Sequence, residues 1–115
     1  MNQVLWNRLC LDSAGTDGAV SEVSRIIQMT GHGANAIQWE ATLFVQSATN
    51  VSYQVEVSND LDNWSPKGSP QTQTNVGHKT FTTDTAIAAA YVRIVATITG
   101  SGKAILAANI TVSSQ

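Results

Sequence analysis

Apolar residues recur at every second position in the last quarter of the chain, with mostly polar residues between them, and this pattern predicts two β-strands. Apolar side chains occupy every second position from Val92 to Ile98 and again from Leu106 to Val112. A period of two buries one face of a strand and leaves the other in water. We expect the two strands to form a hairpin whose loop, Ser101 to Lys103, sets Ile98 opposite Leu106, because a slip of one residue would mix the two faces.

Two earlier segments, Ile37 to Val45 and Val51 to Val57, alternate in the same way and predict a second hairpin. A shorter strand is expected around Phe81. The segment from Glu22 to Met29 fits both helical and strand spacing, and its β-branched residues favour a strand. About seven to eight strands separated by turns rich in Gly, Asn and Asp are typical of a β-sandwich. The sequence thus predicts an all-β fold, an antiparallel β-sandwich of Ig-like or jelly-roll-like form.

The start of the chain carries large apolar residues but shows no clean period. We therefore expect residues 1–11 to form an N-terminal arm or first strand, and residues 12–115 to form a single β-sandwich domain. An arm that reaches a neighbouring subunit would keep apolar residues without a period, because its surroundings come from another chain. Buried aromatic anchors dominate interface energies. Val4, Leu5 and Trp6 are accordingly candidate partner-binding residues, and self-association is expected.

Composition and charge exclude several classes of protein. Only 12% of the 115 residues are charged, the net charge is −2 and no basic stripe is present, so nucleic acid is not an expected partner. The single cysteine, Cys10, excludes an internal disulfide. No apolar run approaches the ~20 residues of a membrane-spanning helix, and Arg8 interrupts any signal-peptide core between Met1 and Cys10. We expect neither membrane association nor a signal peptide.

Residues with catalytic or metal-binding chemistry are sparse. The turn from Asn59 to Asn63 offers alternating oxygen donors, as in half of a calcium loop, but it lacks the central Gly and the bidentate Glu that complete one. Cys10, His32 and His78 show no coherent spacing for a zinc site, and nothing marks the thiol as activated. The sequence therefore predicts a non-enzymatic protein without metal or cofactor.

The aromatic residues divide by their position relative to the strands. Trp39 and Tyr53 fall on the inward phase and are expected in the core. Trp6 and Trp64 lie outside the clear strands. We expect each of them either to fold back onto its own sheet or to contact a partner. A sugar face stacked on the Trp64 indole, with hydrogen bonds from the turn from Asn59 to Asn63, would make the protein a carbohydrate- or receptor-binding module. This module is one of two functions that the sequence leaves open.

Two segments resemble small β-sandwich virion proteins of tailed bacteriophages. They are VSYQVEVSNDLDNWS, from Val51 to Ser65, and YVRIVATITGSGKAILAANITV, from Tyr91 to Val112. The resemblance implies a capsid decoration (cement) protein, or a small head or tail accessory, that binds the major capsid protein or other virion proteins and stabilises the phage head. It also implies a virion location after synthesis in the host cytoplasm, and it carries over no catalytic residue. We expect this structural function first, with the carbohydrate- or receptor-binding module as its alternative.

Overall fold

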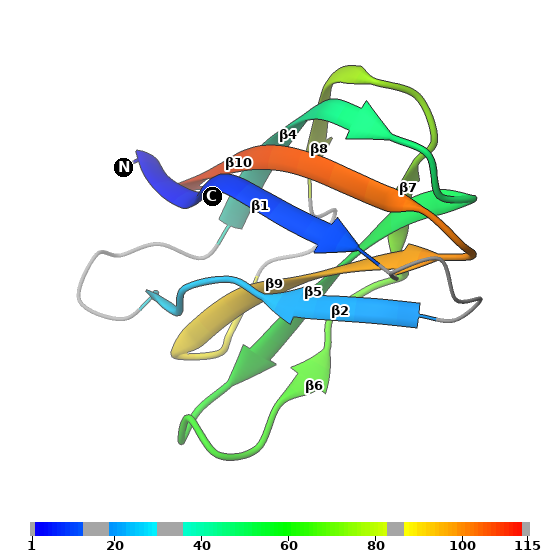
Figure 1. Cartoon of the computed structure of the whole chain (residues 1–115). Coiled ribbons are helices and arrows are strands. Elements are labelled where there is room, and N and C mark those ends of the chain that lie inside the picture. The colour runs from blue at the N-terminus through cyan, green and yellow to red at the C-terminus, as the bar shows by residue number, and fades with distance from the viewer. Residues whose placement is uncertain (1, 13–18, 30–35, 83–86, 114–115) are drawn as a thin grey trace.

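Two antiparallel sheets packed face to face form the fold (Figure 1). The computed structural model describes residues 2–12, 19–29, 36–82 and 87–113. Its strands are β1 (Asn2–Asp12), β2 (Ala19–Val23), β3 (Ile27–Gln28), β4 (Ala36–Gln46), β5 (Asn50–Ser58), β6 (Ser65–Pro66), β7 (Gln71–Gln73), β8 (Gly77–Thr82), β9 (Tyr91–Thr99) and β10 (Lys103–Ser113). The first sheet has the order β1-β10-β4-β8 and the second the order β2-β9-β5-β6, with β3 paired to β9 and β7 to β5.

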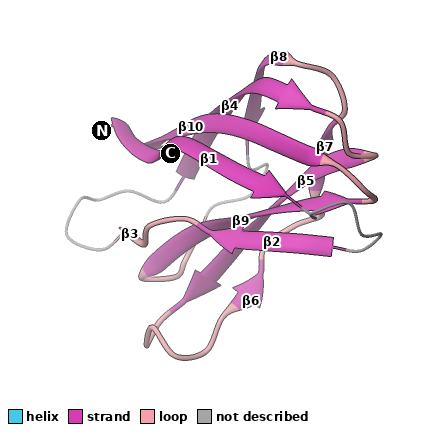
Figure 2. Cartoon of the chain, in the orientation of Figure 1, coloured by secondary structure: helices cyan, strands magenta, loops and turns pink. Residues whose placement is uncertain are grey.

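The predicted all-β class and the antiparallel β-sandwich are confirmed. Figure 2 shows strands and loops throughout the described residues. These residues contain no helix, and therefore none that is long and apolar enough to cross a membrane. The part of the chain that the structure describes has ten strands where seven to eight were predicted, because β3, β6 and β7 are pairings of two or three residues that no periodic pattern marks.

Ser24 explains the mixed spacing between Glu22 and Met29. The segment forms the end of β2 and then β3, and Ser24 lies between them. The Ser24 backbone N–H donates to the Ile94 carbonyl at 2.8 Å, and its hydroxyl accepts from the Ile94 N–H at 2.9 Å. This break shifts the inward phase between β2 and β3, so the apolar residues match no single period.

Both predicted hairpins are wrong, although the predicted buried faces are right. The inward residues of β9 and β10 are buried, including Ile98 and Leu106. However, β9 pairs with β2 and β5, while β10 pairs with β1 and β4 in the other sheet. In the same way β4 and β5 belong to different sheets. A period of two determines which face of a strand is buried. It does not distinguish a hairpin from a connection that crosses the core to the opposite sheet.

The connection from β4 to β5, residues 47–49, lies beside the connection from β9 to β10, residues 100–102, and hydrogen bonds join them. The Ser47 N–H donates to the Lys103 carbonyl at 2.9 Å, and the Thr49 N–H donates to the Thr99 carbonyl at 2.8 Å. Gly102 has a φ of +141°, and a Cβ there would lie 2.7 Å from the Ser47 backbone. Only glycine fits this approach without strain. The connections thus direct β5 and β10 into opposite sheets.

An aromatic cluster joins the two sheets at the centre of the core. Trp39 on β4 stacks on Phe81 of β8, with ring centres 4.1 Å apart, and meets Tyr53 of β5 edge-on at 5.1 Å. Trp39 and Tyr53 are buried, as their inward phase predicts. Burial raises the pKa of the Tyr53 hydroxyl far above its usual value. That hydroxyl donates to Gln73 Oε1 at 3.0 Å, so the buried oxygen atom is paired.

Strand β1 pairs with β10 along its length, so of the two predicted alternatives, an arm or a first strand, the first strand is the one that forms. Register shifts occur between Val4 and Trp6 and between Trp6 and Leu9. Each shift changes the face to which the following side chains point, so a strand of the chain's own sheet shows no clean alternation. Leu5 is 5% exposed and lies in the core, and Trp6 packs against the core. Val4 remains 43% exposed.

Candidate functional site

Trp64 lies against a pair of charged residues on the second sheet. It directly precedes β6, which pairs with the end of β5. Glu56 on β5 and Arg93 on β9 lie opposite each other in the register, and Arg93 Nε donates to Glu56 Oε1 at 2.7 Å. The Arg93 guanidinium carbon lies 4.2 Å from the centre of the Trp64 ring, a cation–π contact. Two strands and the residue that precedes β6 thus contribute to one cluster, which we call the Trp64 cluster: Glu56, Trp64 and Arg93.

The turn between β5 and β6 is organised around the carboxylate of Asp60. Asp60 Oδ1 accepts from the backbone N–H of Asp62 at 3.0 Å and of Asn63 at 2.9 Å, and Oδ2 accepts from the Asn63 side chain at 2.7 Å. The backbone hydrogen bond from Asn63 is the main reason why the pKa of Asp60 lies well below its usual range. Leu61 has a positive φ of 68°, and its carbonyl accepts from Trp64 Nε1 at 3.2 Å.

The turn between β5 and β6 is also hydrogen-bonded to the residue that precedes β9 in the second sheet. Asn59 Oδ1 accepts from the backbone N–H of Ala90, just before β9, at 3.0 Å. The Ser58 hydroxyl accepts from the N–H groups of Asp60 and Leu61 at 3.2 and 3.0 Å. Within this turn, the side-chain oxygen atoms of Asn59 and Asp60 thus accept hydrogen bonds from the protein. Within the described residues no group of three or more His, Cys, Asp or Glu side chains is placed to hold a metal ion.

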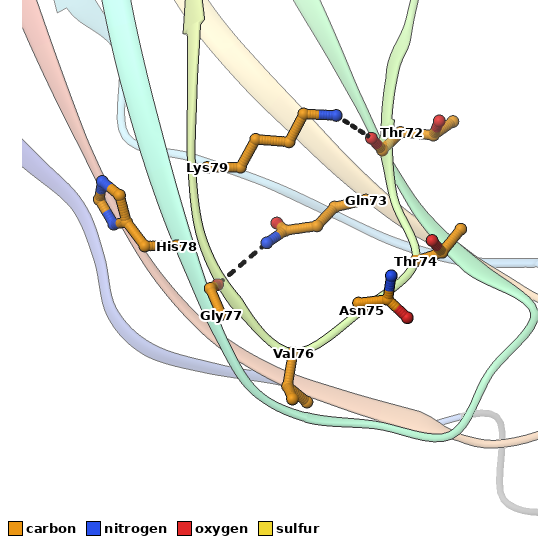
Figure 3. A pocket seen from close by; sticks show the side chains of 8 residues that line it. All are labelled: Thr72, Gln73, Thr74, Asn75, Val76, Gly77, His78 and Lys79. Atoms are coloured by element: carbon orange, nitrogen blue, oxygen red, sulfur yellow. Dashed lines mark hydrogen bonds between the residues drawn. The ribbon is translucent and has the colours of Figure 1, made fainter.

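A second feature, a polar pocket at the other end of β5, was missed by the sequence analysis. It measures about 350 Å³ and is lined by Thr72, Gln73, Thr74, Asn75, Val76, Gly77, His78 and Lys79 (Figure 3). Gln73 Nε2 donates to the Gly77 carbonyl at 3.0 Å, and Lys79 Nζ donates to the Thr72 carbonyl at 3.1 Å. The run QTQTN from Gln71 to Asn75 was the available signal, but a polar run alone predicts only a loop.

Comparison with known proteins shows the family to which the chain belongs. Residues 33–110, which include β4 to β9 and most of β10, match the family model of the F5/8 type C domain. The chain belongs to this family. A search of the curated proteins finds no match. Among solved structures, this F5/8 type C domain is similar to one titled "Family 16 Carbohydrate Binding Module-2", with a TM-score of 0.42 and 13% identity over 93% of this chain and 74% of the other. None of these findings names a virion protein.

The candidate partner-binding residues of this F5/8 type C domain fall at two separate places. Val4, Leu5 and Trp6 lie on β1, at the edge of the first sheet that adjoins β2. Trp64 lies beside β6, at the opposite edge of the second sheet. Leu5 is enclosed by the core and cannot contact a partner in this fold. The four residues therefore do not form one surface.

Of the three residues considered for zinc, the two that the structure describes, Cys10 and His78, are not brought together. Cys10 lies on β1 and His78 on β8, the two edges of the first sheet, with β10 and β4 between them. At a strand spacing of ~4.8 Å this separation is about 14 Å. His32 lies outside the described residues.

His78 instead belongs to a small polar group on the outer face of the first sheet. Its Nδ1 lies 3.0 Å from the Thr42 hydroxyl, and its Nε2 lies 3.3 Å from Glu40 Oε2. Hydroxyl, imidazole and carboxylate are also the groups of a hydrolytic triad. Here, however, the His78 and Glu40 side chains are exposed on an open sheet face. A nucleophile in this position would not be screened from water, so the arrangement is explained by cross-strand pairing.

Proposed function

We propose that this F5/8 type C domain is a carbohydrate-binding module without catalytic activity of its own, and that Trp64 is its sugar-stacking residue. The observation that carries the proposal is the low exposure of Arg93, whose side chain is 22% exposed on the outer face of the second sheet. An arginine at such a position is ordinarily exposed. Its guanidinium is covered because the indole of Trp64 lies against it. One ring face is thus supported by the protein, and Trp64 as a whole remains partly exposed.

The rigidity of the Trp64 cluster supports the same function. The indole N–H is hydrogen-bonded within the turn, and the turn is held by Asp60 and Asn59. A side chain that is already ordered loses little conformational entropy when a ligand binds, which matters most for ligands that bind weakly. Aromatic side chains supply the apolar surface on which the C–H face of a sugar packs. Asp62 and Asn63 are exposed beside the ring and can bond the hydroxyl groups.

A glycan array followed by titration tests this function. The labelled domain is expected to bind at least one class of glycan, and Trp64→Ala is expected to weaken that binding about tenfold or more, equivalent to about 1.4 kcal/mol. Phe44→Ala is a matched control, because Phe44 is also an exposed aromatic residue with an arginine, Arg8, 4.6 Å from its ring centre. It lies on the other sheet, so its loss should leave binding unchanged.

Three outcomes would contradict the proposal. The first is an array without any bound glycan. The second is an affinity of Trp64→Ala equal to that of the unmodified domain, with both proteins shown to be folded by their thermal unfolding midpoints. Equal losses in Trp64→Ala and Phe44→Ala would point to a general effect on the fold and would also count against the site.

The capsid-decoration function stays a prediction from the sequence resemblance. The family match and the similar solved structure name no virion component. The segment expected to reach a neighbouring subunit is a strand of the chain's own sheet. Nothing in the described part of the chain favours this function over carbohydrate binding.

A further inference from the structure

We propose that the pocket between β7 and β8 is a second ligand site, separate from the Trp64 cluster, and that it binds a hydroxyl-rich ligand carrying a carboxylate, such as a uronic acid residue of a glycan. Its volume of about 350 Å³ lies within the ~300–1,000 Å³ typical of small-ligand pockets. This inference goes beyond the proposed function, because it concerns a different site and a different ligand chemistry.

The two sites lie at opposite ends of β5. Strand β6, beside Trp64, pairs with Glu56 and Val57, whereas β7 pairs with Val51 to Tyr53. A separation of three strand residues or more corresponds to about 10 Å or more. The pocket extends further still, into the connection that follows β7. One sugar ring therefore cannot occupy both sites.

Gln73 can form hydrogen bonds beyond the two that its side chain makes within the protein. Its side chain lies in the middle of the pocket (Figure 3), and the residue is only 6% exposed. Its Oε1 accepts one hydrogen bond, from Tyr53, and its Nε2 donates one, to the Gly77 carbonyl. A primary amide has two N–H groups and two acceptor positions on oxygen, so one donor and one acceptor remain. A ligand hydroxyl, which both donates and accepts, can complete both.

The wall of the pocket offers more groups of the same kind. The hydroxyls of Thr72 and Thr74 and the amide of Asn75 line it. Among the described residues, none of these three side chains has a hydrogen-bond partner, although the backbone carbonyls of Thr72 and Thr74 are bonded. Hydroxyls and amides at this density match a ligand with several hydroxyl groups.

The charge of the pocket favours an acidic ligand. Lys79 contributes an ammonium group, and no lining residue is a carboxylate. The salt bridges of the described residues join His78 to Glu40 and Arg93 to Glu56, so Lys79 has no acidic partner there. An ammonium group has three N–H donors, and Lys79 uses one of them on the Thr72 carbonyl. Figure 3 shows His78 on the other side of β8 from Lys79, so Glu40 bonds a side chain that points away from the pocket.

Calorimetric titration with two matched probes tests the inference. The probes are a trimer of galacturonic acid and a galactose trimer of the same linkage. The acidic trimer is expected to bind at least tenfold more tightly, and its binding should shift the two side-chain amide proton resonances of Gln73. Lys79→Met is expected to remove the preference for the acidic trimer, and Asn75→Ala to weaken both probes.

Two variants serve as controls for this titration. Lys67→Met removes a lysine outside the pocket and should leave binding unchanged, which separates a local effect from the change in net charge. Trp64→Ala should also bind the acidic trimer normally, so failure of the Trp64 function and failure of this inference are distinguishable. The inference is overturned by equal affinity for the two trimers, by undetectable binding of both, by unperturbed Gln73 resonances, or by an unchanged preference in Lys79→Met.

Discussion

At the scale of single residues, the molecule depends on polar side chains whose partners are not their sequence neighbours. Gln73 bonds the buried Tyr53 hydroxyl on another strand, and Arg93 reaches across β5 to Trp64. Trp64 could be selected from the sequence because it lies outside every periodic segment. The role of Gln73 could not, because it depends on the position of β7 against β5. A polar residue in a polar run carries no sign of burial until its partner strand is known.

Asp60 permits a test at the scale of single residues, because the hydrogen bonds of the turn are made to its ionised carboxylate. A carboxyl whose pKa is lowered in the folded state adds stability above its unfolded pKa of about 3.9, and this stability is lost as the pH falls towards the folded pKa. Asp60→Asn should therefore lower the thermal unfolding midpoint at pH ~7. The difference from the unmodified protein should shrink as the pH falls below about 4.

Asp62→Asn is the control for this experiment. Asp62 belongs to the same turn, but it contributes its backbone N–H rather than its side chain to the hydrogen bonds around Asp60. The thermal unfolding midpoint of Asp62→Asn should follow that of the unmodified protein across the same pH range. A constant difference between Asp60→Asn and the unmodified protein at every pH would contradict the role assigned to the carboxylate.

At the scale of elements, the sequence predicts strands well and strand partners poorly. The alternation in β4, β5, β9 and β10 correctly identifies the buried side chains, because burial on one face requires it. The same alternation is compatible with a hairpin and with a connection to the opposite sheet. Which of the two connections forms depends on the packing of residues 47–49 against residues 100–102, where Gly102 contacts the backbone of Ser47. That contact joins segments far apart in the sequence, and no local pattern contains it.

Gly102→Ala tests whether this close approach matters. A Cβ at Gly102 would overlap the Ser47 backbone, whereas a Cβ at Gly68, which also has a positive φ of 74°, would meet nothing within 4 Å. Gly68→Ala should therefore show only backbone strain, about 1 kcal/mol of unfolding free energy. Gly102→Ala should lose about 2 kcal/mol more, from the overlap. Chemical denaturation of both variants measures the difference, and equal losses would show that the connections do not depend on their contact.

At the scale of the whole molecule, both sheets close around one core, and each outer face has its own chemistry. The second sheet carries the Trp64 cluster, while the first carries Phe44 and Val45 beside Arg8 and the polar group around His78. Only 12% of the residues are charged, and a surface of hydroxyl and amide groups is compatible with contact to neighbouring subunits. The structure adds a different explanation, because hydroxyl and amide side chains are concentrated at the polar pocket. Composition alone could not separate a surface that binds copies of itself from one that binds sugars.

The position of β1 provides a test of whether the domain is complete without a neighbouring chain. Val4 and Leu5 are adjacent, but Leu5 is 5% exposed and Val4 is 43% exposed. If β1 belongs to the chain's own sheet, Leu5→Ala should lower the unfolding free energy of the monomer by about 2–5 kcal/mol. Val4→Ala should change it by no more than about 0.5 kcal/mol. An arm that reaches another subunit would give a different result. The stability of the monomer would be unchanged in both variants, and association between subunits would be lost. Denaturation at two protein concentrations, with sedimentation analysis of the folded state, separates these outcomes, because only an intersubunit contact makes stability depend on concentration.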